Sequence, residues 1–345
     1  MDKDLNIRGN SIYTLVDMDI STDPPNWFNS GRTESNKVGG ELATVTTKEE
    51  YLFIVDNFKK ETDRAIIGLH DSSDDLNYRW TSGEEVDLSQ LNSELTLDFG
   101  STGDHKEDYA GMFFEEPYAS LGKLNDYGYY SGGMQGLPTI GIAETPFIRR
   151  GDSAYVVVEG PTWEEAEANA NKLGGHLVAI NDAQENDYIS SKLNIPNDWY
   201  FIGATDDNAY GASEGNWLWT NGDSFSYTNW GIGEPNNQHP DGENFSGIGI
   251  GILEEGSRWF NKWNDTVGLS PEKGIAEIKL APNNAPTGTL SITGDAKVGG
   301  TMTITLISEI KDEDNFEGYT PTYNYSWETS SDNGETWTVL SSSDA

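Results

Sequence analysis

The sequence predicts an α+β protein in which one fold occurs twice in tandem and a separate all-β module follows. Three observations carry this prediction: a long internal repeat, helix patterns followed by short strands in each copy, and strict apolar and polar alternation near the end. The chain has 345 residues, which is enough for two or three domains.

The repeat is visible as two pairs of matching segments. Gly39-Gly40-Glu41-Leu42 returns as Gly174-Gly175-His176-Leu177, and Gly141-Ile142-Ala143-Glu144 returns unchanged as Gly274-Ile275-Ala276-Glu277. The offsets, 135 residues from Gly39 to Gly174 and 133 from Gly141 to Gly274, are far longer than the units of a solenoid. We therefore predict two copies of one domain, over residues 8–147 and 152–282.

Each copy is expected to open with two helices. In the second copy Trp163, Ala166 and Ala170 form one apolar face at helical spacing, and Gly174-Gly175 follows where the helix should end.

The second helix of each copy has a capping pattern at its start. Thr47 and Glu50 form a capping box in the first copy, and Asn181 with Gln184 three residues later is the corresponding pair in the second. Short strands are predicted to follow in the second copy, at 200–203, 217–220, 248–251 and 275–278. Long loops rich in Gly, Asn and Asp separate them, and such loops inside a compact domain are usually functional.

The end of the chain has a pure strand pattern. Beyond a linker at Pro282, Met302, Ile304 and Leu306 alternate with threonines, as in a strand with one buried face. Residues 286–345 are therefore predicted to form an all-β sandwich, which resembles the immunoglobulin-like repeats of large bacterial surface proteins. We interpret the module as a stabilising spacer without a site of its own, and we expect it to be cut short at Ala345.

Acidic residues dominate the composition. The chain has 58 Asp and Glu against 21 Lys and Arg, a formal net charge of −37, which excludes nucleic acid and anionic lipid as partners and favours cations. No cysteine is present, so disulfides and thiolate metal sites are excluded. No apolar run is long enough for a membrane span, and the first residues lack a signal-peptide pattern, so membrane insertion is not expected.

Oxygen-bearing side chains gather in three short stretches of the second copy, which are Glu234-Pro235-Asn236, Gly242-Glu243-Asn244 and Trp263-Asn264-Asp265. Ca²⁺ takes about six to eight oxygen ligands from carboxylates, amide and backbone carbonyls, and water. These stretches can supply about that number. The sequence therefore predicts Ca²⁺ as a bound cofactor.

The order of motifs in the second copy resembles the C-type lectin-like domain family over residues 153–282. The resemblance rests on Trp163, Leu173-Gly174-Gly175-His176-Leu177, Phe201-Ile202-Gly203, Glu214-Gly215-Asn216-Trp217 and the three oxygen-rich stretches. The family normally has two disulfides, and the resemblance places Ala170 with Ala276, and Phe245 with Gly268, at the cysteine positions.

The resemblance implies a sugar-binding Ca²⁺ site formed by Glu234, Asn236, Glu243, Asn264 and Asp265, all of which would also face the sugar. A cis bond before Pro235 would turn the Glu234 and Asn236 side chains to the same side. The Glu-Pro-Asn form implies a ligand with equatorial 3- and 4-hydroxyls, namely mannose, glucose, fucose or N-acetylglucosamine.

Two further sets of residues match the family less completely. An auxiliary Ca²⁺ site is implied at Asp206, Glu214, Asn237 and Asn244, together with Glu243. The first copy retains Asp71, Glu107, Asp108, Asn125 and Asp126, but no Glu-Pro-Asn lies between Trp80 and Glu107. Sugar binding is not expected there; a structural Ca²⁺ ion, a protein-docking surface and a decayed site remain alternatives.

Two functional hypotheses follow. The first is a calcium-dependent, mannose-type carbohydrate-binding adhesin or recognition module, located outside the cell, on a cell surface or on a virion. The alternative is a protein-binding or structural display module of a surface or phage particle, in which calcium serves only stability. Catalysis is not expected, because the sequence has neither histidines at zinc-ligand spacing nor a phosphate-binding loop.

Overall fold

The chain folds into two compact units, Met1–Ala281 and Pro282–Ala345. The computed structural model describes residues 5–19, 21, 24–71, 77–98, 107–128, 138–192, 198–250, 260–269, 271–280, 287–294, 302–311, 324–332 and 336–344.

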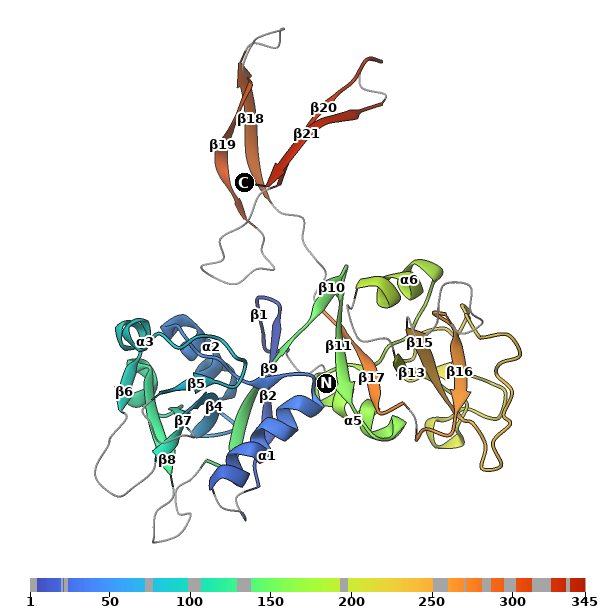
Figure 1. Cartoon of the computed structure of the whole chain (residues 1–345), viewed down its shortest axis with the longest axis horizontal. Coiled ribbons are helices and arrows are strands. Elements are labelled where there is room, and N and C mark those ends of the chain that lie inside the picture. Colours follow the sequence, from blue (N-terminus) through green and yellow to red (C-terminus); the bar gives the residue numbers. More distant parts are fainter. Residues whose placement is uncertain are drawn as a thin grey trace. The chain divides into compact units, whose positions relative to one another are not determined.

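Two sheets of the first unit share one strand order, to which the first sheet adds one further edge strand (Figure 1). The first runs β1 (Ile7–Arg8), β2 (Ser11–Asp17), β9 (Ile140–Pro146), β4 (Arg64–His70), β7 (Glu107–Phe113), β8 (Lys123–Gly128) and β6 (Thr96–Asp98), with β3 (Glu41–Leu42) on β9 and β5 (Arg79–Trp80) on β4. The second runs β10 (Ile148–Arg150), β11 (Ser153–Glu159), β17 (Lys273–Lys279), β13 (Asp198–Thr205), β15 (Phe245–Ile250) and β16 (Trp263–Thr266), with β12 (His176–Leu177) on β17 and β14 (Leu218–Trp219) on β13.

The pairing directions of the two sheets also agree. β4 runs parallel to β9, with Ile66 opposite Gly141, and β13 runs parallel to β17, with Phe201 opposite Gly274. The strands predicted in the second copy correspond to β13, β14, β15 and β17.

Each copy contains the two predicted helices, α1 (Pro24–Lys37) and α2 (Lys48–Phe58), then α5 (Trp163–Lys172) and α6 (Ala183–Lys192), but they do not open the copy, because the strands β2 and β11 precede them. The first copy adds α3 (Leu88–Glu94) and α4 (Tyr118–Leu121), and the second adds a 3-10 turn, η1 (Asn208–Tyr210). The Thr47 cap is confirmed, because its Oγ1 accepts from the Glu50 N–H at 3.2 Å.

The predicted cap of α6 is wrong by one residue. Asp182, not Asn181, caps the helix, and its Oδ1 accepts from the Glu185 N–H at 2.7 Å. The Glu185 carboxylate accepts in turn from the Asn181 N–H at 2.9 Å. The capping box lies one residue later than predicted because Glu185 faces the interior, where the Tyr155 hydroxyl donates to it at 2.5 Å.

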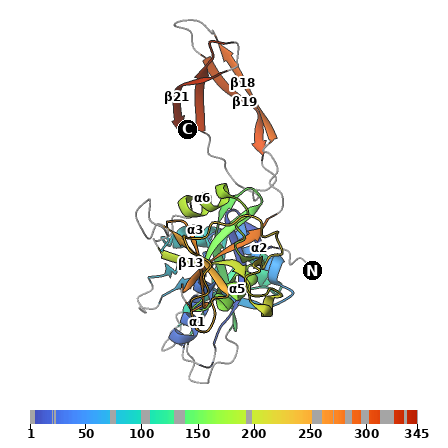
Figure 2. The ribbon, with the colours of Figure 1, turned by 90° about the vertical axis from the view of Figure 1, so that its right-hand side faces the viewer.

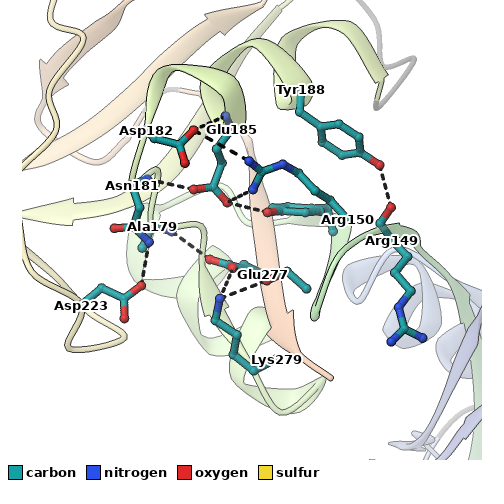
Figure 3. A network of polar contacts seen from close by, with 12 residues as sticks. Arg149, Arg150, Ala179, Asn181, Asp182, Glu185, Tyr188, Asp223, Glu277 and Lys279 are labelled. Carbon is teal, nitrogen blue, oxygen red and sulfur yellow. Dashed lines mark hydrogen bonds and ion pairs between the residues drawn. The ribbon is translucent and has the colours of Figure 1, made fainter. Parts of the chain in front are cut away.

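This buried carboxylate belongs to a polar network of the second copy (Figure 3), and the first copy has a counterpart of its central contact. Arg150 Nη1 lies 3.6 Å from Glu185 Oε1, and burial raises the pKa of Glu185. In the first copy the Tyr13 hydroxyl donates to Glu50 Oε1 at 2.8 Å, and burial raises the pKa of Glu50 in the same way. The two copies therefore share interior polar chemistry as well as topology.

Removing either tyrosine hydroxyl is expected to destabilise the protein. Tyr13→Phe and Tyr155→Phe should each lower the free energy of unfolding by about 1–3 kcal/mol, because each leaves a buried carboxylate oxygen with one donor fewer. Urea denaturation measures this loss. Tyr210→Phe, at a 36% exposed ring, is the matched control, with an expected change within about 0.5 kcal/mol. Equal losses at Tyr155 and Tyr210 would contradict the prediction.

The two copies share one apolar cluster. It contains Trp27 and Val38 from the first copy and Val156 and Trp163 from the second. Helices α1 and α5 lie near this junction in both views (Figures 1 and 2), and the Lys172 Nζ of α5 is 3.5 Å from Glu34 Oε2 of α1. Residues 1–281 thus form one packed body, inside which the domain boundary predicted between 147 and 152 falls.

The second unit contains two antiparallel strand pairs among its described residues. β18 (Thr287–Gly294) pairs with β19 (Met302–Lys311), and β20 (Asn324–Thr329) pairs with β21 (Thr338–Asp344). The alternating segment from Met302 lies in β19, as predicted. The immunoglobulin-like sandwich stays a prediction.

Within the described part of the chain, no helix combines the length and the apolar character that crossing a bilayer requires.

Candidate functional site

An aromatic cluster anchors the loop that carries Glu234. The Gly231 N–H donates to the Trp263 carbonyl at 2.8 Å, and the Trp230 ring meets the Trp263 ring edge-on with centroids 5.7 Å apart. Trp263 is fully buried, and its Nε1 donates to Asn186 Oδ1 of α6 at 2.9 Å. The loop therefore rests on the core of the second copy.

Asp265 ties this loop to strand β16. The bond between Glu234 and Pro235 is cis, as expected. Just beyond it, the N–H groups of Asn236 and Asn237 donate to Asp265 Oδ2 at 2.9 and 2.7 Å. Asp265 is only 1% exposed, so one carboxylate oxygen fixes the loop from inside.

Two neighbouring carboxylates of the predicted sugar site act on Glu234. Burial and the neighbouring Asp265 carboxylate raise the pKa of Glu234, and Glu243 adds to the shift. The Asn236 Nδ2 donates to Glu234 Oε2. Since like charges held together disfavour ionisation, this group favours a proton or a cation.

The remaining predicted ligands surround the same loop. Glu243 Oε2 accepts from the Gln238 N–H at 2.7 Å, and the Glu243 N–H donates to Asn237 Oδ1 at 2.8 Å. Asn264 lies on β16, and its Nδ2 donates to the Asp265 carbonyl at 2.6 Å. All five residues of the predicted sugar site therefore lie around one loop and the adjoining end of β16.

The predicted auxiliary set borders this site. Asp206 is 3% exposed, and its Oδ2 accepts from the Gly215 N–H at 2.7 Å. Burial raises the pKa of Asp206, and the Glu214 and Asp265 carboxylates raise it further. Asn244 Nδ2 donates to Asp207 Oδ2 at 3.1 Å.

The motifs do not predict Asp207 beside the auxiliary set, where its Oδ2 accepts from Asn244 Nδ2. The available signal was its place in the Asp206-Asp207 pair directly after a predicted strand.

Two buried oxygens in these sets have no hydrogen-bond partner, Asp206 Oδ1 and Asp265 Oδ1. A buried carboxylate oxygen without a partner destabilises the fold unless a cation or proton compensates it. The atoms available as metal ligands are carboxylate and amide oxygens, which suit a hard cation such as Ca²⁺ rather than zinc or copper.

The side chains do not converge on one point. Among the described residues, no group of three or more His, Asp and Glu side chains has the geometry of a metal site. The Asn236 and Asn264 amides direct their Nδ2 atoms at neighbouring oxygens, so ion binding would need both amides to turn over and present Oδ1.

In the first copy, the acidic residues of the predicted set lie at positions equivalent to those of the second copy. Asp71 and Asp126 are 3% and 4% exposed. The Asp71 N–H donates to the Asp108 carbonyl at 2.7 Å, as the Asp206 N–H donates to the Asn244 carbonyl at 3.1 Å.

The two remaining predicted residues of this set lie on neighbouring strands. Asn125 is on β8, and its Nδ2 donates to the Asp126 carbonyl. Glu107 is in β7, and its side chain lies outside the described residues.

Where the second copy has its Glu-Pro-Asn loop, the first copy has α3 and β6. β6 runs parallel to β8, and the Lys123 Nζ of β8 lies 2.6 Å from Asp98 Oδ2 of β6. Within the described residues, the first copy therefore offers no counterpart of Glu234 and Asn236.

Apolar packing fills the positions of the absent disulfides. Ala170 and Ala276 are both fully buried in the shared apolar cluster. A Cβ at Gly268 would lie 2.6 Å from Phe245 Cδ2, so the phenyl ring occupies the space there.

Comparison with known proteins gives a family for the second copy. Residues 159–272 match the family model described as Lectin C-type domain. The chain therefore contains one C-type lectin domain, at these residues.

Relatives match parts of the chain. Human C-type mannose receptor 2 is 28% identical over 214 residues, which cover 57% of this chain and 13% of that protein. Human asialoglycoprotein receptor 2 is 31% identical over 120 residues, 34% of each chain. The chain thus spans well under two thirds of these relatives. The solved mouse scavenger receptor C-type lectin carbohydrate-recognition domain is 26% identical, covers 39% of this chain and 94% of its own, and has a TM-score of 0.33.

Proposed function

We propose that the second copy is a calcium-dependent carbohydrate-recognition module with a preference for mannose-type sugars. Members of the C-type lectin family are generally non-enzymatic carbohydrate-binding proteins, and the family match covers this copy. The observation that carries the calcium part is the buried Asp265 Oδ1, which lacks a partner beside Glu234 and Glu243.

Each residue of the site has a distinct part in this proposal. Asp265 holds the loop through Oδ2 and offers Oδ1 to the ion. Glu234 and Glu243 supply carboxylate oxygens that accept hydrogen bonds from sugar hydroxyls, and the Asn236 and Asn264 amides donate to hydroxyl oxygens. Bound Ca²⁺ would supply a positive centre for two neighbouring hydroxyls.

We expect calcium to be required for glycan binding, with mannose, glucose, fucose or N-acetylglucosamine as ligands. A glycan array probed with calcium and with EDTA measures this. Glu234→Gln combined with Asn236→Asp should weaken mannose binding at least about tenfold, since it rearranges the groups that pair with the hydroxyls.

The control for this experiment is Glu164→Gln, at an exposed carboxylate on α5, which should leave the array unchanged. Galactose selectivity of the wild type, or binding indifferent to EDTA, would contradict the proposal. Calcium binding without any glycan would favour the structural alternative.

The other site sets extend the proposal. Asp206, Glu214, Asn237 and Asn244 are proposed as an auxiliary calcium site, supported by the unpartnered Asp206 Oδ1. The first copy is proposed to be a second domain of the same fold without a sugar site, supported by the matching strand order and buried network. The first copy then serves as a scaffold or as a surface for a protein partner. We propose an extracellular, cell-surface or virion location.

A further inference from the structure

A cavity of about 610 Å³ lies between the two copies, inside the first unit. The first copy contributes most of the lining, and the second contributes Val157, Glu159 and Lys273. The charged side chains that line it are Glu41, Glu84, Glu144, Glu159 and Lys273. Its volume is typical of small-molecule sites, and its lining is predominantly anionic.

Two of these glutamates lie directly opposite each other on neighbouring strands. Glu41 on β3 is the direct partner of Glu144 on β9, and like charges directly opposite in a sheet are destabilising. Glu41 Oε2 is shielded from solvent and has no hydrogen-bond partner among the described residues, although it forms an ion pair with Arg32, whose Nε is 3.7 Å away. Glu144 Oε2 accepts from the Thr44 N–H at 3.2 Å.

The second copy has its own ammonium group at the equivalent place. Lys279 Nζ lies 2.8 Å from Glu277 Oε1 and 3.0 Å from Ser153 Oγ, and the Ser153 hydroxyl donates to the same carboxylate oxygen at 2.7 Å (Figure 3 shows Glu277 and Lys279). Residue His176, rather than a glutamate, is the strand partner of Glu277. The Glu277 carboxylate therefore has an ammonium group and a hydroxyl donor from within the chain.

Strand register shows what replaces this lysine in the first copy. Ser153 is opposite Lys279 in the β11–β17 pair, and Ser11 is opposite Pro146 in the equivalent β2–β9 pair. Pro146 therefore stands where the second copy has its lysine. The cavity is lined by Ser11, Glu144 and Pro146. It therefore includes the position that the Lys279 ammonium group occupies in the second copy.

We propose that this cavity binds the primary ammonium group of a small ligand, with Ser11 and Glu144 holding it as Ser153 and Glu277 hold Lys279. The cavity is much larger than one ammonium group, and Glu41, Glu84 and Glu159 line the rest of it. The ligand class is therefore a small molecule with two or more amino groups, either an aliphatic polyamine or an amino sugar oligomer.

The test is titration calorimetry on the full chain in EDTA, with spermidine and with fully deacetylated chitotriose as probes. Pro146→Lys should abolish binding or weaken it at least about tenfold, because the new ammonium group occupies the site itself. Pro161→Lys, an exposed proline outside the cavity lining, makes the same change of charge and should bind like the wild type.

A second variant guards against misfolding. Glu144→Gln keeps an oxygen for the Thr44 N–H but removes the charge, so it should weaken binding about as much as Pro146→Lys does. Because EDTA removes calcium, failure of the sugar site would not affect this result.

Each outcome decides the proposal. Binding of spermidine alone assigns an aliphatic polyamine, binding of chitotriose alone assigns an amino sugar, and binding of both assigns the shared ammonium chemistry. Equal binding of N-acetylated probes, equal loss in Pro146→Lys and Pro161→Lys, or no binding of either amine would overturn it.

Discussion

Asp265→Asn is expected to stabilise the protein without calcium and to make it less stable than the wild type with calcium. Asparagine can still accept from the Asn236 and Asn237 N–H groups, while its amide replaces a charged oxygen that has no partner. Without the ion, removing that buried charge should raise the free energy of unfolding by about 1 kcal/mol. With calcium at a hundredfold excess over its dissociation constant, the wild type alone should gain about 2.7 kcal/mol.

The pH dependence of this difference follows from the pKa of Glu234, which burial and Asp265 raise. A carboxyl with a raised pKa binds more protons in the native state than in the unfolded state, so its contribution to stability falls as pH rises through that window. As pH falls towards the ordinary carboxyl pKa, Glu234 becomes protonated. This removes the charge repulsion between Glu234 and Asp265. The advantage of Asp265→Asn without calcium should therefore shrink on acidification.

Urea denaturation with calcium and with EDTA measures both effects. Asp187→Asn, at an exposed position of α6, controls for the loss of one charge. Asp126→Asn makes the same change at the equivalent buried position of the first copy, and a calcium-dependent effect there would reveal an ion in that copy. If the order of stability of wild type and Asp265→Asn did not reverse between the two conditions, calcium would not bind at Asp265.

The features that could be predicted from sequence are those set by local patterns. The apolar spacing of Trp163, Ala166 and Ala170 predicts α5, and the Thr47 box predicts the start of α2. The shift of the α6 cap could not be predicted, because Tyr155, 30 positions away, selects Glu185 as the inward-facing carboxylate. Contacts between distant segments decide such choices.

The same distinction holds for the site. The motifs place Glu234 and Asp265 near each other, and the Asp265 carboxylate helps to raise the pKa of Glu234. That Asp265 Oδ1 lacks a partner depends on where the loop and β16 meet, which no motif specifies. The motifs also do not predict that one copy packs against the other, because the apolar residues of each copy indicate only a core for that copy.

Gly39→Ala is expected to destabilise the protein far more than Gly83→Ala, because only Gly39 lies against the other copy. Both glycines have a left-handed backbone, with φ of +75° and +85°. A Cβ at Gly39 would lie 2.2 Å from the Val157 carbonyl oxygen and 2.7 Å from Val156 Cγ1, whereas a Cβ at Gly83 meets nothing within 4 Å.

Backbone strain alone should cost about 1–2 kcal/mol at either position. Overpacking against the second copy should add about 1–3 kcal/mol at Gly39, because the Val157 carbonyl belongs to β11 and cannot move aside without disturbing that strand. Urea denaturation of the two variants measures the difference, and equal losses would mean that the two copies do not press on each other at this turn. A larger loss in Gly39→Ala than in Gly83→Ala, with one cooperative transition in the wild type, would show that the lectin domain depends on the first copy for its stability.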